Sequence, residues 1–100
     1  MKHSVEKIIA QINAKHPNDP TISDDYLEII TLLSASDDQT INVLNELDID
    51  QIDCISSIFE EVSANLQSAR FIDCIKEIAK KYPSILNIKE HVNWAIEAMD

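Results

Sequence analysis

Glycine is absent from this chain of 100 residues, and aromatic residues contribute only 5% of it. Primed hairpin turns and phosphate-binding loops both depend on glycine, so we expect neither. The first residues also lack a long apolar run, because Glu6, Gln11 and two lysines interrupt residues 1–12. A signal peptide or a membrane-spanning helix requires such a run, and we therefore expect a cytoplasmic protein.

Cysteine is scarce as well, and Cys54 and Cys74 each lie inside an Ile-Asp-Cys-Ile tetrapeptide. This apolar setting favours buried thiols over a disulfide framework, and no histidine stands nearby at the spacing of a zinc site. Asp48, Asp50 and Asp53 do not form a calcium loop, because the glycine and the final glutamate of such a loop are missing. No serine stands in a nucleophile elbow. We expect no catalytic residue, no metal and no cofactor, and hence not an enzyme.

Positive charge is the third scarcity. Eight Lys and Arg residues stand against 18 Asp and Glu residues, which gives a formal net charge of −10. None of the cations lies between Lys15 and Arg70, although this stretch holds twelve acidic residues. Nucleic acids and anionic membranes require a basic surface, so we expect neither as a partner. Carboxylates without internal counter-charges repel one another and attract cationic molecules, which favours a basic protein as the partner.

The spacing of the apolar residues predicts an all-α fold. Seventeen isoleucines would favour strands by propensity alone, but they recur at intervals of three and four, as in helices. Three prolines and short polar breaks divide the chain into six expected helices. These run from about Ser4 to Lys15, Ser23 to Ser34, Ser36 to Leu47, Asp48 to Val62, Gln67 to Tyr82, and from Asn87 onward. Short connections predict antiparallel neighbours, and we expect a single domain over residues 1–100, an irregular helical bundle with some HEAT-like character.

Local signals add detail to these helices. Capping motifs are predicted at Ser36-x-x-Gln39, at Asp48 or Asp50, and at Asn87-x-x-Glu90. The second helix carries leucines on both sides of its apolar face, so it is the candidate central helix. The fourth helix contains the sequence Ile-Asp-Cys-Ile followed by a further isoleucine, and the same pattern of expected buried positions is repeated 20 residues later in the fifth helix. The outer positions of the fifth helix are basic instead of acidic, with Arg70, Lys76, Lys80 and Lys81.

Ten acidic residues are the candidate partner contacts. At about 100° per residue, one straight fourth helix places its acids on a single stripe opposite the buried isoleucines. The favoured contacts are on this stripe: Asp50, Asp53, Glu60 and Glu61. The supporting candidates come from the second and third helices: Asp24, Asp25, Glu28, Asp37, Asp38 and Glu46. Trp94 departs from the apolar face of the last helix and is either an interface anchor or a half-covered residue that contacts an earlier helix.

Two resemblances bear on function. The segment Leu47-Asp48-Ile49-Asp50-Gln51-Ile52 is similar to the attachment region of acyl carrier proteins, but Gln51 replaces the serine that carries their prosthetic group. In size, acidity, helical content and lack of catalytic residues, the whole chain resembles the small cytosolic immunity proteins of bacterial polymorphic toxins, including contact-dependent growth inhibition systems and nuclease bacteriocins. Ile22-Ser23-Asp24-Asp25-Tyr26 is similar to a segment of the bacteriocin immunity family, whose Asp-Tyr-Tyr-Pro motif is missing here.

The second resemblance implies an inhibitor that binds a basic cognate toxin. The toxin would be a nuclease, with an RNase favoured, and the complex a 1:1 heterodimer in which carboxylates on a rigid helical scaffold block a basic cleft. The alternative is a helical-repeat adaptor or scaffold that binds a cellular protein through its grooves. For an adaptor, charge reversal on the acidic stripe should matter little, and Trp94 or groove residues should dominate binding.

Overall fold

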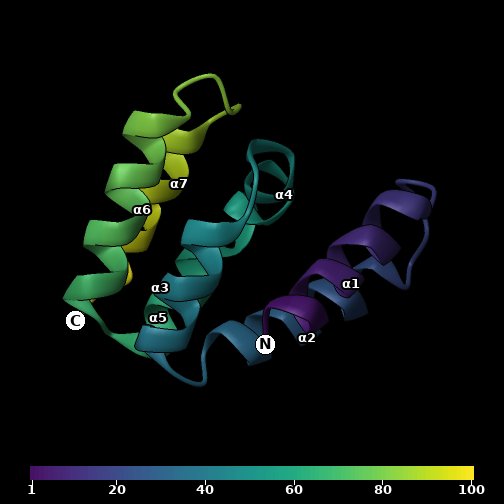
Figure 1. Cartoon of the computed structure of the whole chain (residues 1–100), viewed down its shortest axis with the longest axis horizontal. Coiled ribbons are helices and arrows are strands. Elements are labelled where there is room, and N and C mark those ends of the chain that lie inside the picture. Colours follow the sequence, from purple (N-terminus) through teal and green to yellow (C-terminus); the bar gives the residue numbers. More distant parts are fainter.

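The periodic apolar residues form helices throughout the chain. The computed structural model describes residues 1–100 as seven α-helices and one short 3-10 helix, with no strand (Figure 1). In chain order the elements are α1 (Lys2–Ala14), α2 (Ile22–Leu33), α3 (Asp37–Glu46), α4 (Ile49–Ile55), η1 (Ser56–Ile58), α5 (Phe59–Leu66), α6 (Ala69–Lys81) and α7 (Ile88–Glu97). The predicted all-α helical bundle is confirmed.

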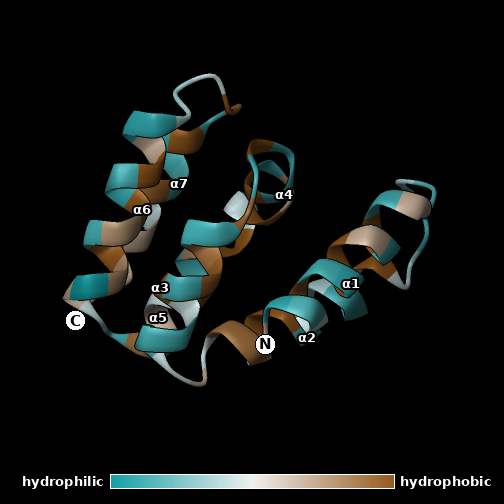
Figure 2. Ribbon diagram, viewed as in Figure 1, coloured by the Kyte–Doolittle hydropathy of each residue, from teal (hydrophilic) through white to brown (hydrophobic).

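Two helical hairpins lie on opposite sides of the molecule. One consists of α1 and α2, the other of α6 and α7, and the remaining helices lie between them (Figure 1). Contacts also join elements that are distant in the chain, since α3 packs on α6 and α5 packs on α7. Every helix contributes to one core cluster of 22 buried hydrophobic residues. Figure 2 shows the corresponding pattern, with hydrophobic residues on the inner sides of the helices and hydrophilic residues outside.

The prediction of α2 as the central helix is wrong. α2 lies at the edge of the molecule beside α1 (Figure 1), and its Leu27 is 60% exposed. The interior position belongs to α5, which contacts α2, α6 and α7 and buries Phe59 and Val62. Phe59 meets Phe71 of α6 edge to face, with ring centroids 6.2 Å apart, an arrangement that the ring quadrupoles favour.

The expected acidic helix is not one helix. It consists of α4, the single 3-10 turn η1 and α5, because Ile55 and Ile58 leave regular helical geometry with φ values of −101° and −104°. The hydroxyl of Ser56 is buried and donates a hydrogen bond to the carbonyl oxygen of Asp53, at 3.0 Å. Such a bond competes with the regular helical ladder, and helices often bend at adjacent small polar residues such as Ser56-Ser57. The prediction of one straight helix that carries the acidic residues is therefore wrong.

The capping predictions have mixed outcomes. Asp48 caps α4 in a complete capping box, in which its carboxylate accepts from the backbone of Gln51 while the side chain of Gln51 accepts from the backbone of Asp48. Ser36 caps α3 by accepting from the backbone of Gln39. The predicted box at Asn87 is wrong, because Asn87 precedes α7 in the left-handed region at φ 59° and its side chain makes no capping hydrogen bond.

The repeated tetrapeptides do share their buried positions. Ile52 and Ile55 of α4 and Ile72 and Ile75 of α6 all lie in the core. The similarity therefore reflects two helices that pack the same apolar pattern against one core, and the basic residues between Arg70 and Lys81 lie on the outer side of α6. None of the helices is both long enough and apolar enough to cross a lipid bilayer.

Candidate partner-binding surface

The ten predicted acidic contacts are spread over α2, α3, α4 and α5. Eight of them are exposed to solvent, while Asp37 is half-buried and Asp25 is buried at 7% exposure. A carboxylate this deeply buried presents little surface to another protein. Asp25 is therefore a poor contact residue, and its environment shows what it does instead.

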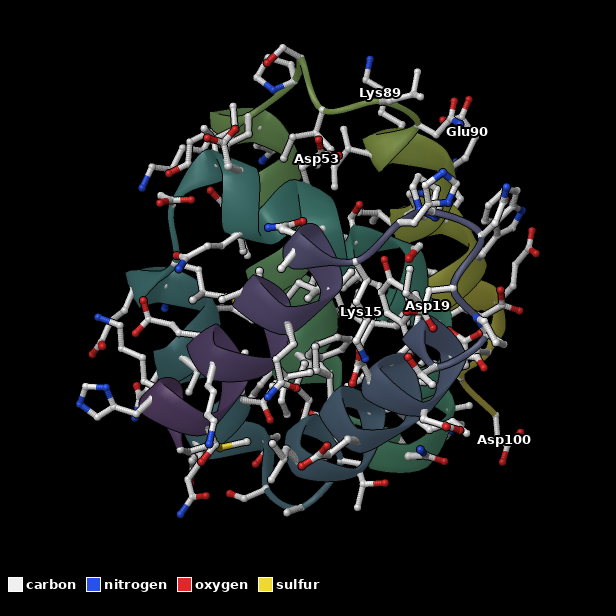
Figure 3. All side chains as sticks on the ribbon, turned by 90° about the vertical axis from the view of Figure 1, so that its right-hand side faces the viewer. Lys15, Asp19, Asp53, Lys89, Glu90 and Asp100 are labelled. Carbon is white, nitrogen blue, oxygen red and sulfur yellow. The ribbon has the colours of Figure 1, made fainter.

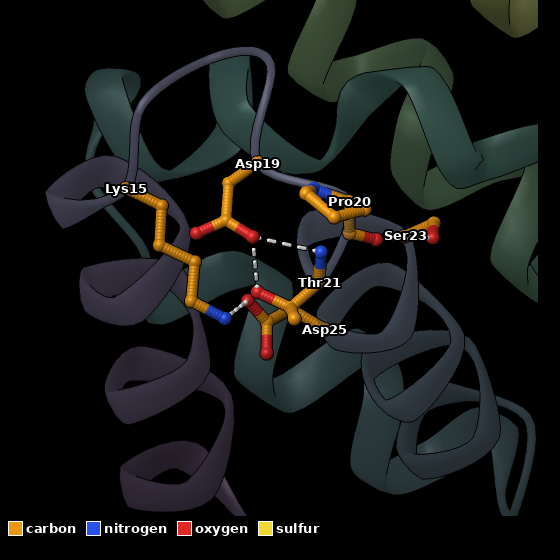
Figure 4. Close-up of polar contacts among 6 residues, drawn as sticks. All are labelled: Lys15, Asp19, Pro20, Thr21, Ser23 and Asp25. Atoms are coloured by element: carbon orange, nitrogen blue, oxygen red, sulfur yellow. Dashed lines mark hydrogen bonds and ion pairs between the residues drawn. The ribbon is translucent and has the colours of Figure 1, made fainter.

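Asp25 is part of a polar cluster that joins α1 to α2 (Figure 4). The ammonium group of Lys15 lies 2.6 Å from Asp25 Oδ2, and both side chains are largely covered. In the turn between the helices, Asp19 Oδ1 accepts hydrogen bonds from the hydroxyl and the backbone N–H of Thr21, at 2.6 Å and 2.9 Å. These two bonds, with a smaller contribution from the charge of Lys15, lower the pKa of Asp19 below its usual 3.8. The cluster holds the α1–α2 hairpin together.

Three further candidates of α3 have partners within the chain. Asp38 forms an ion pair with Arg70, and its hydrogen bond and its charge raise the pKa of the guanidinium. Glu46 lies 3.4 Å from the ammonium group of Lys2, and Asp37 accepts a 2.8 Å hydrogen bond from the hydroxyl of Ser68. Exposed ion pairs of this kind are weak and salt-sensitive, and they neutralise Asp38 and Glu46, whereas the hydroxyl of Ser68 brings no opposite charge to Asp37.

Six candidates remain exposed with no ion pair to any lysine, arginine or histidine. They lie on three elements, α2, α4 and α5: Asp24, Glu28, Asp50, Asp53, Glu60 and Glu61. We refer to these six residues as the free acidic set. All four residues that the sequence analysis favoured belong to it.

The α4 part of this set lies next to α2. The hydroxyl of Tyr26 on α2 donates a hydrogen bond to the backbone oxygen of Cys54, at 3.4 Å. Burial raises the pKa of Tyr26, and the nearby charges of Cys54 and Asp53 raise it further. Asp53 therefore lies close enough to α2 to influence its polar side chains, which brings α4 and α2 into one region. No comparable contact joins Glu60 and Glu61 to Asp50.

The two cysteines lie at the margin of the core and are not fully buried as predicted. Cys54 and Cys74 are free thiols of intermediate exposure and sit on the edge of apolar faces whose centres are occupied by isoleucines. Partial burial raises the pKa of both thiols, and for Cys74 it is the sole cause of this increase. No three His, Cys, Asp or Glu side chains come together as a metal-binding group.

Exposed apolar residues are the feature that the acidic pattern did not predict. Leu86 is 77% exposed and Trp94 is 45% exposed, and with Leu27 of α2 they are the most exposed large apolar side chains. Trp94 contacts His91 edge to face, with ring centroids 5.4 Å apart. The departure of Trp94 from the apolar face of its helix was the sequence signal for its partial exposure. Leu27 gave a similar signal, since it lies to the side of the apolar face of α2.

The free acidic set presents exposed carboxylates on three helices. Exposed carboxylates on short rigid helices can form ion pairs and hydrogen bonds with Arg and Lys of another molecule. Comparison of the chain with models of protein families, with curated proteins and with solved structures finds no match.

Proposed function

We propose that this protein is an immunity protein that binds and neutralises a basic toxin, with a nuclease, and an RNase in particular, as the favoured target. The proposal rests on one observation, the free acidic set. These six exposed carboxylates lie in a stretch of the chain that contains no lysine or arginine, and no ion pair within the molecule neutralises them.

The proposed mechanism is occlusion of a basic cleft. A nuclease must present positive charge to hold phosphates, and the net charge of −10 would speed its encounter with this protein at low salt. Once the two molecules touch, a few central carboxylates paired with arginines would supply most of the specificity. Asp50 and Asp53 on α4, and Glu60 and Glu61 on α5, are the proposed central contacts.

The remaining candidates have smaller roles in this proposal. Asp25 is already held by Lys15, and Asp38 and Glu46 would have to leave Arg70 and Lys2 before they could bind another cation. Each exchange of one exposed ion pair for another gains little free energy, since such pairs contribute only about 0.2–1 kcal/mol. The free acidic set should therefore dominate binding.

Charge reversal tests the proposal against the cognate toxin, which we expect to be a toxic domain encoded by a neighbouring gene. We expect D50K/D53K and E60K/E61K each to weaken binding at least tenfold in isothermal titration calorimetry and to reduce protection in a growth assay. The matched control is E90K/E97K on α7, which makes the same change in net charge at two residues outside the free acidic set. Equal losses of affinity in all three variants would show that net charge alone determines binding and that the free acidic set has no special role. Unchanged affinity in the first two variants would refute the proposal.

A protein-binding adaptor is the second candidate function, and the exposure of Leu27, Leu86 and Trp94 favours it. Large apolar side chains at a surface are frequent anchors of protein interfaces. In this case W94A should abolish partner binding while D50K/D53K leaves it intact. The two functions therefore predict opposite outcomes for the same pair of variants.

A further inference from the structure

A groove lined by lysines lies where α6 and α7 pack side by side (Figure 1). Both helices belong to the part of the sequence that follows the cation-free stretch. Its volume is about 260 Å³, and its lining combines three lysines with small or polar residues: Lys76, Ala79, Lys80, Lys89, Val92 and Asn93. We refer to this feature as the lysine groove. It gathers three of the eight cations of the chain.

The lysines of this groove are short of partners within the molecule. Lys76 and Lys89 form no ion pair, and Lys80 has one with Glu77, at 3.3 Å, in which both side chains are about three-quarters exposed. Elsewhere most cations are engaged, as Lys15 is with Asp25 and Arg70 with Asp38. In a chain with 18 acidic residues, three lysines that line one groove with one weak ion pair among them are unexpected.

Helix stabilisation explains only one of the three lysines. Lys80 lies in the last turn of α6, where a cation interacts favourably with the helix dipole. Lys89 lies in the first turn of α7, where the same dipole disfavours positive charge. Lys89 and its neighbour Glu90 project outward at this end of the molecule (Figure 3). The position of Lys89 therefore calls for a reason outside the helix that carries it.

We propose that the lysine groove binds an acidic segment of a partner protein, in which carboxylates flank an apolar side chain. Ala79 and Val92 give the groove a small apolar floor, and the side chains of the three lysines and Asn93 line the rest of it. An apolar side chain of the segment would cover this floor while its carboxylates reach Lys76, Lys80 and Lys89. None of the residues that line the groove belongs to the free acidic set, so the inference goes beyond the proposed function and does not depend on it.

The surroundings of the groove favour a short acidic peptide over a polyanion. Glu77 and Glu90 flank the lysines, and repulsion from them and from the net charge of −10 is greater for an extended nucleic acid or an anionic membrane than for a short peptide with few carboxylates. A free phosphate would leave the apolar floor uncovered. A peptide can place its carboxylates on the lysines alone.

The test is a titration of the ¹⁵N-labelled protein with the peptide acetyl-Glu-Glu-Leu-Glu-Glu-amide, followed by amide chemical shifts. We expect saturable shifts confined to α6 and α7, including the amides of Ala79 and Val92. Since an exposed ion pair contributes up to about fivefold in affinity, K76Q/K89Q should weaken binding by roughly fivefold or more. The matched control K2Q/K7Q, which removes two lysines from α1, should leave the affinity unchanged. The spectra themselves report whether each variant is folded.

Other outcomes would overturn the proposal. Absence of shifts at millimolar peptide would do so, as would equal weakening by K2Q/K7Q. Replacing the central leucine of the peptide by serine should weaken binding, and equal affinity would refute the role of the apolar floor. Tighter binding of inorganic phosphate, of a single-stranded oligonucleotide or of vesicles with anionic lipid would assign the groove to a different class of ligand.

Discussion

Replacing Lys15 by methionine, which removes its ammonium group, should destabilise the fold more than the same replacement of any other lysine. In K15M, the carboxylate of Asp25 would lose a partner at 2.6 Å while its side chain stays only 10% exposed. Breaking one member of a buried pair typically costs about 3–5 kcal/mol. The Lys15 side chain is 27% exposed, so water can reach the site. We therefore expect the free energy of unfolding to fall by about 2–3 kcal/mol, at or below the lower end of that range.

This loss is measurable because the domain is small. A change of 1 kcal/mol shifts the midpoint of thermal unfolding by roughly 4–8 °C at this size, so K15M should unfold at least about 8 °C below the wild type in a circular-dichroism melt. Urea unfolding should give the same ranking of free energies. K7M is the matched control, because Lys7 is exposed on α1 and forms no ion pair, and its effect should stay within about 0.5 kcal/mol.

The double variant K15M/D25L separates the pair from the packing around it. Removing both charges avoids an unpaired buried carboxylate, and apolar replacement of a buried pair is often neutral or stabilising. We therefore expect the double variant to be more stable than K15M. A K15M protein as stable as K7M, or a double variant less stable than K15M, would refute the view that Asp25 is held by its ion pair.

Three other predictions concern the turn, the C-terminus and the thiols. Folding lowers the pKa of Asp19. The ionised side chain therefore stabilises the fold above about pH 4, and this stabilisation disappears as the pH falls through the lowered pKa. D19N should flatten the dependence of stability on pH in that acidic range. Gln67 has φ 47°, and its side chain forms hydrogen bonds with the backbone of Ala98 and Asp100. Q67A should therefore lower the free energy of unfolding in urea by about 1 kcal/mol. Q67G should lower it less, because glycine adopts the left-handed backbone without strain, and equal losses would contradict this. Burial raises the pKa of the Cys54 and Cys74 thiols, so both should react with a disulfide reagent more slowly in the native protein than in urea at pH 8, and equal rates would contradict it.

The helices were predictable because their signals are local. Spacing of apolar residues depends on neighbours three and four positions away, and the core positions Ile52 and Ile75 follow from it. The break between α4 and α5 depends on a buried hydroxyl, Ser56, whose burial is a tertiary property. The adjacent serines were the available sign, and the apolar pattern that continues through them concealed it.

The ion pairs were beyond the reach of the sequence for a related reason. Lys15 and Asp25 are ten positions apart, and Arg70 and Asp38 are 32 apart, so each pair depends on how the helices pack. A count of charges along the chain treats Asp25 and Asp38 like Asp53. Only the packing separates a carboxylate that stabilises a hairpin from one that is free to bind another molecule.

The distribution of charge gains a sharper meaning once these pairs are known. The cations at the borders of the cation-free stretch, Lys15 and Arg70, fold back onto it and neutralise Asp25 and Asp38. Salt weakens the repulsion among the other carboxylates, because at physiological ionic strength charges interact only over about 8 Å. Carboxylates closer than this distance still repel one another. Lys76 and Lys89 remain unpaired although an excess of acidic residues could have supplied partners. If folding stability alone had determined the surface, acids and bases would be mixed over it, because opposite charges as neighbours are more stable than like charges. Acids and lysines are mixed in this way on α6 and α7, whereas the six residues of the free acidic set have no basic neighbours along the chain, and it is this unmixed part of the surface that the proposed basic partner would explain.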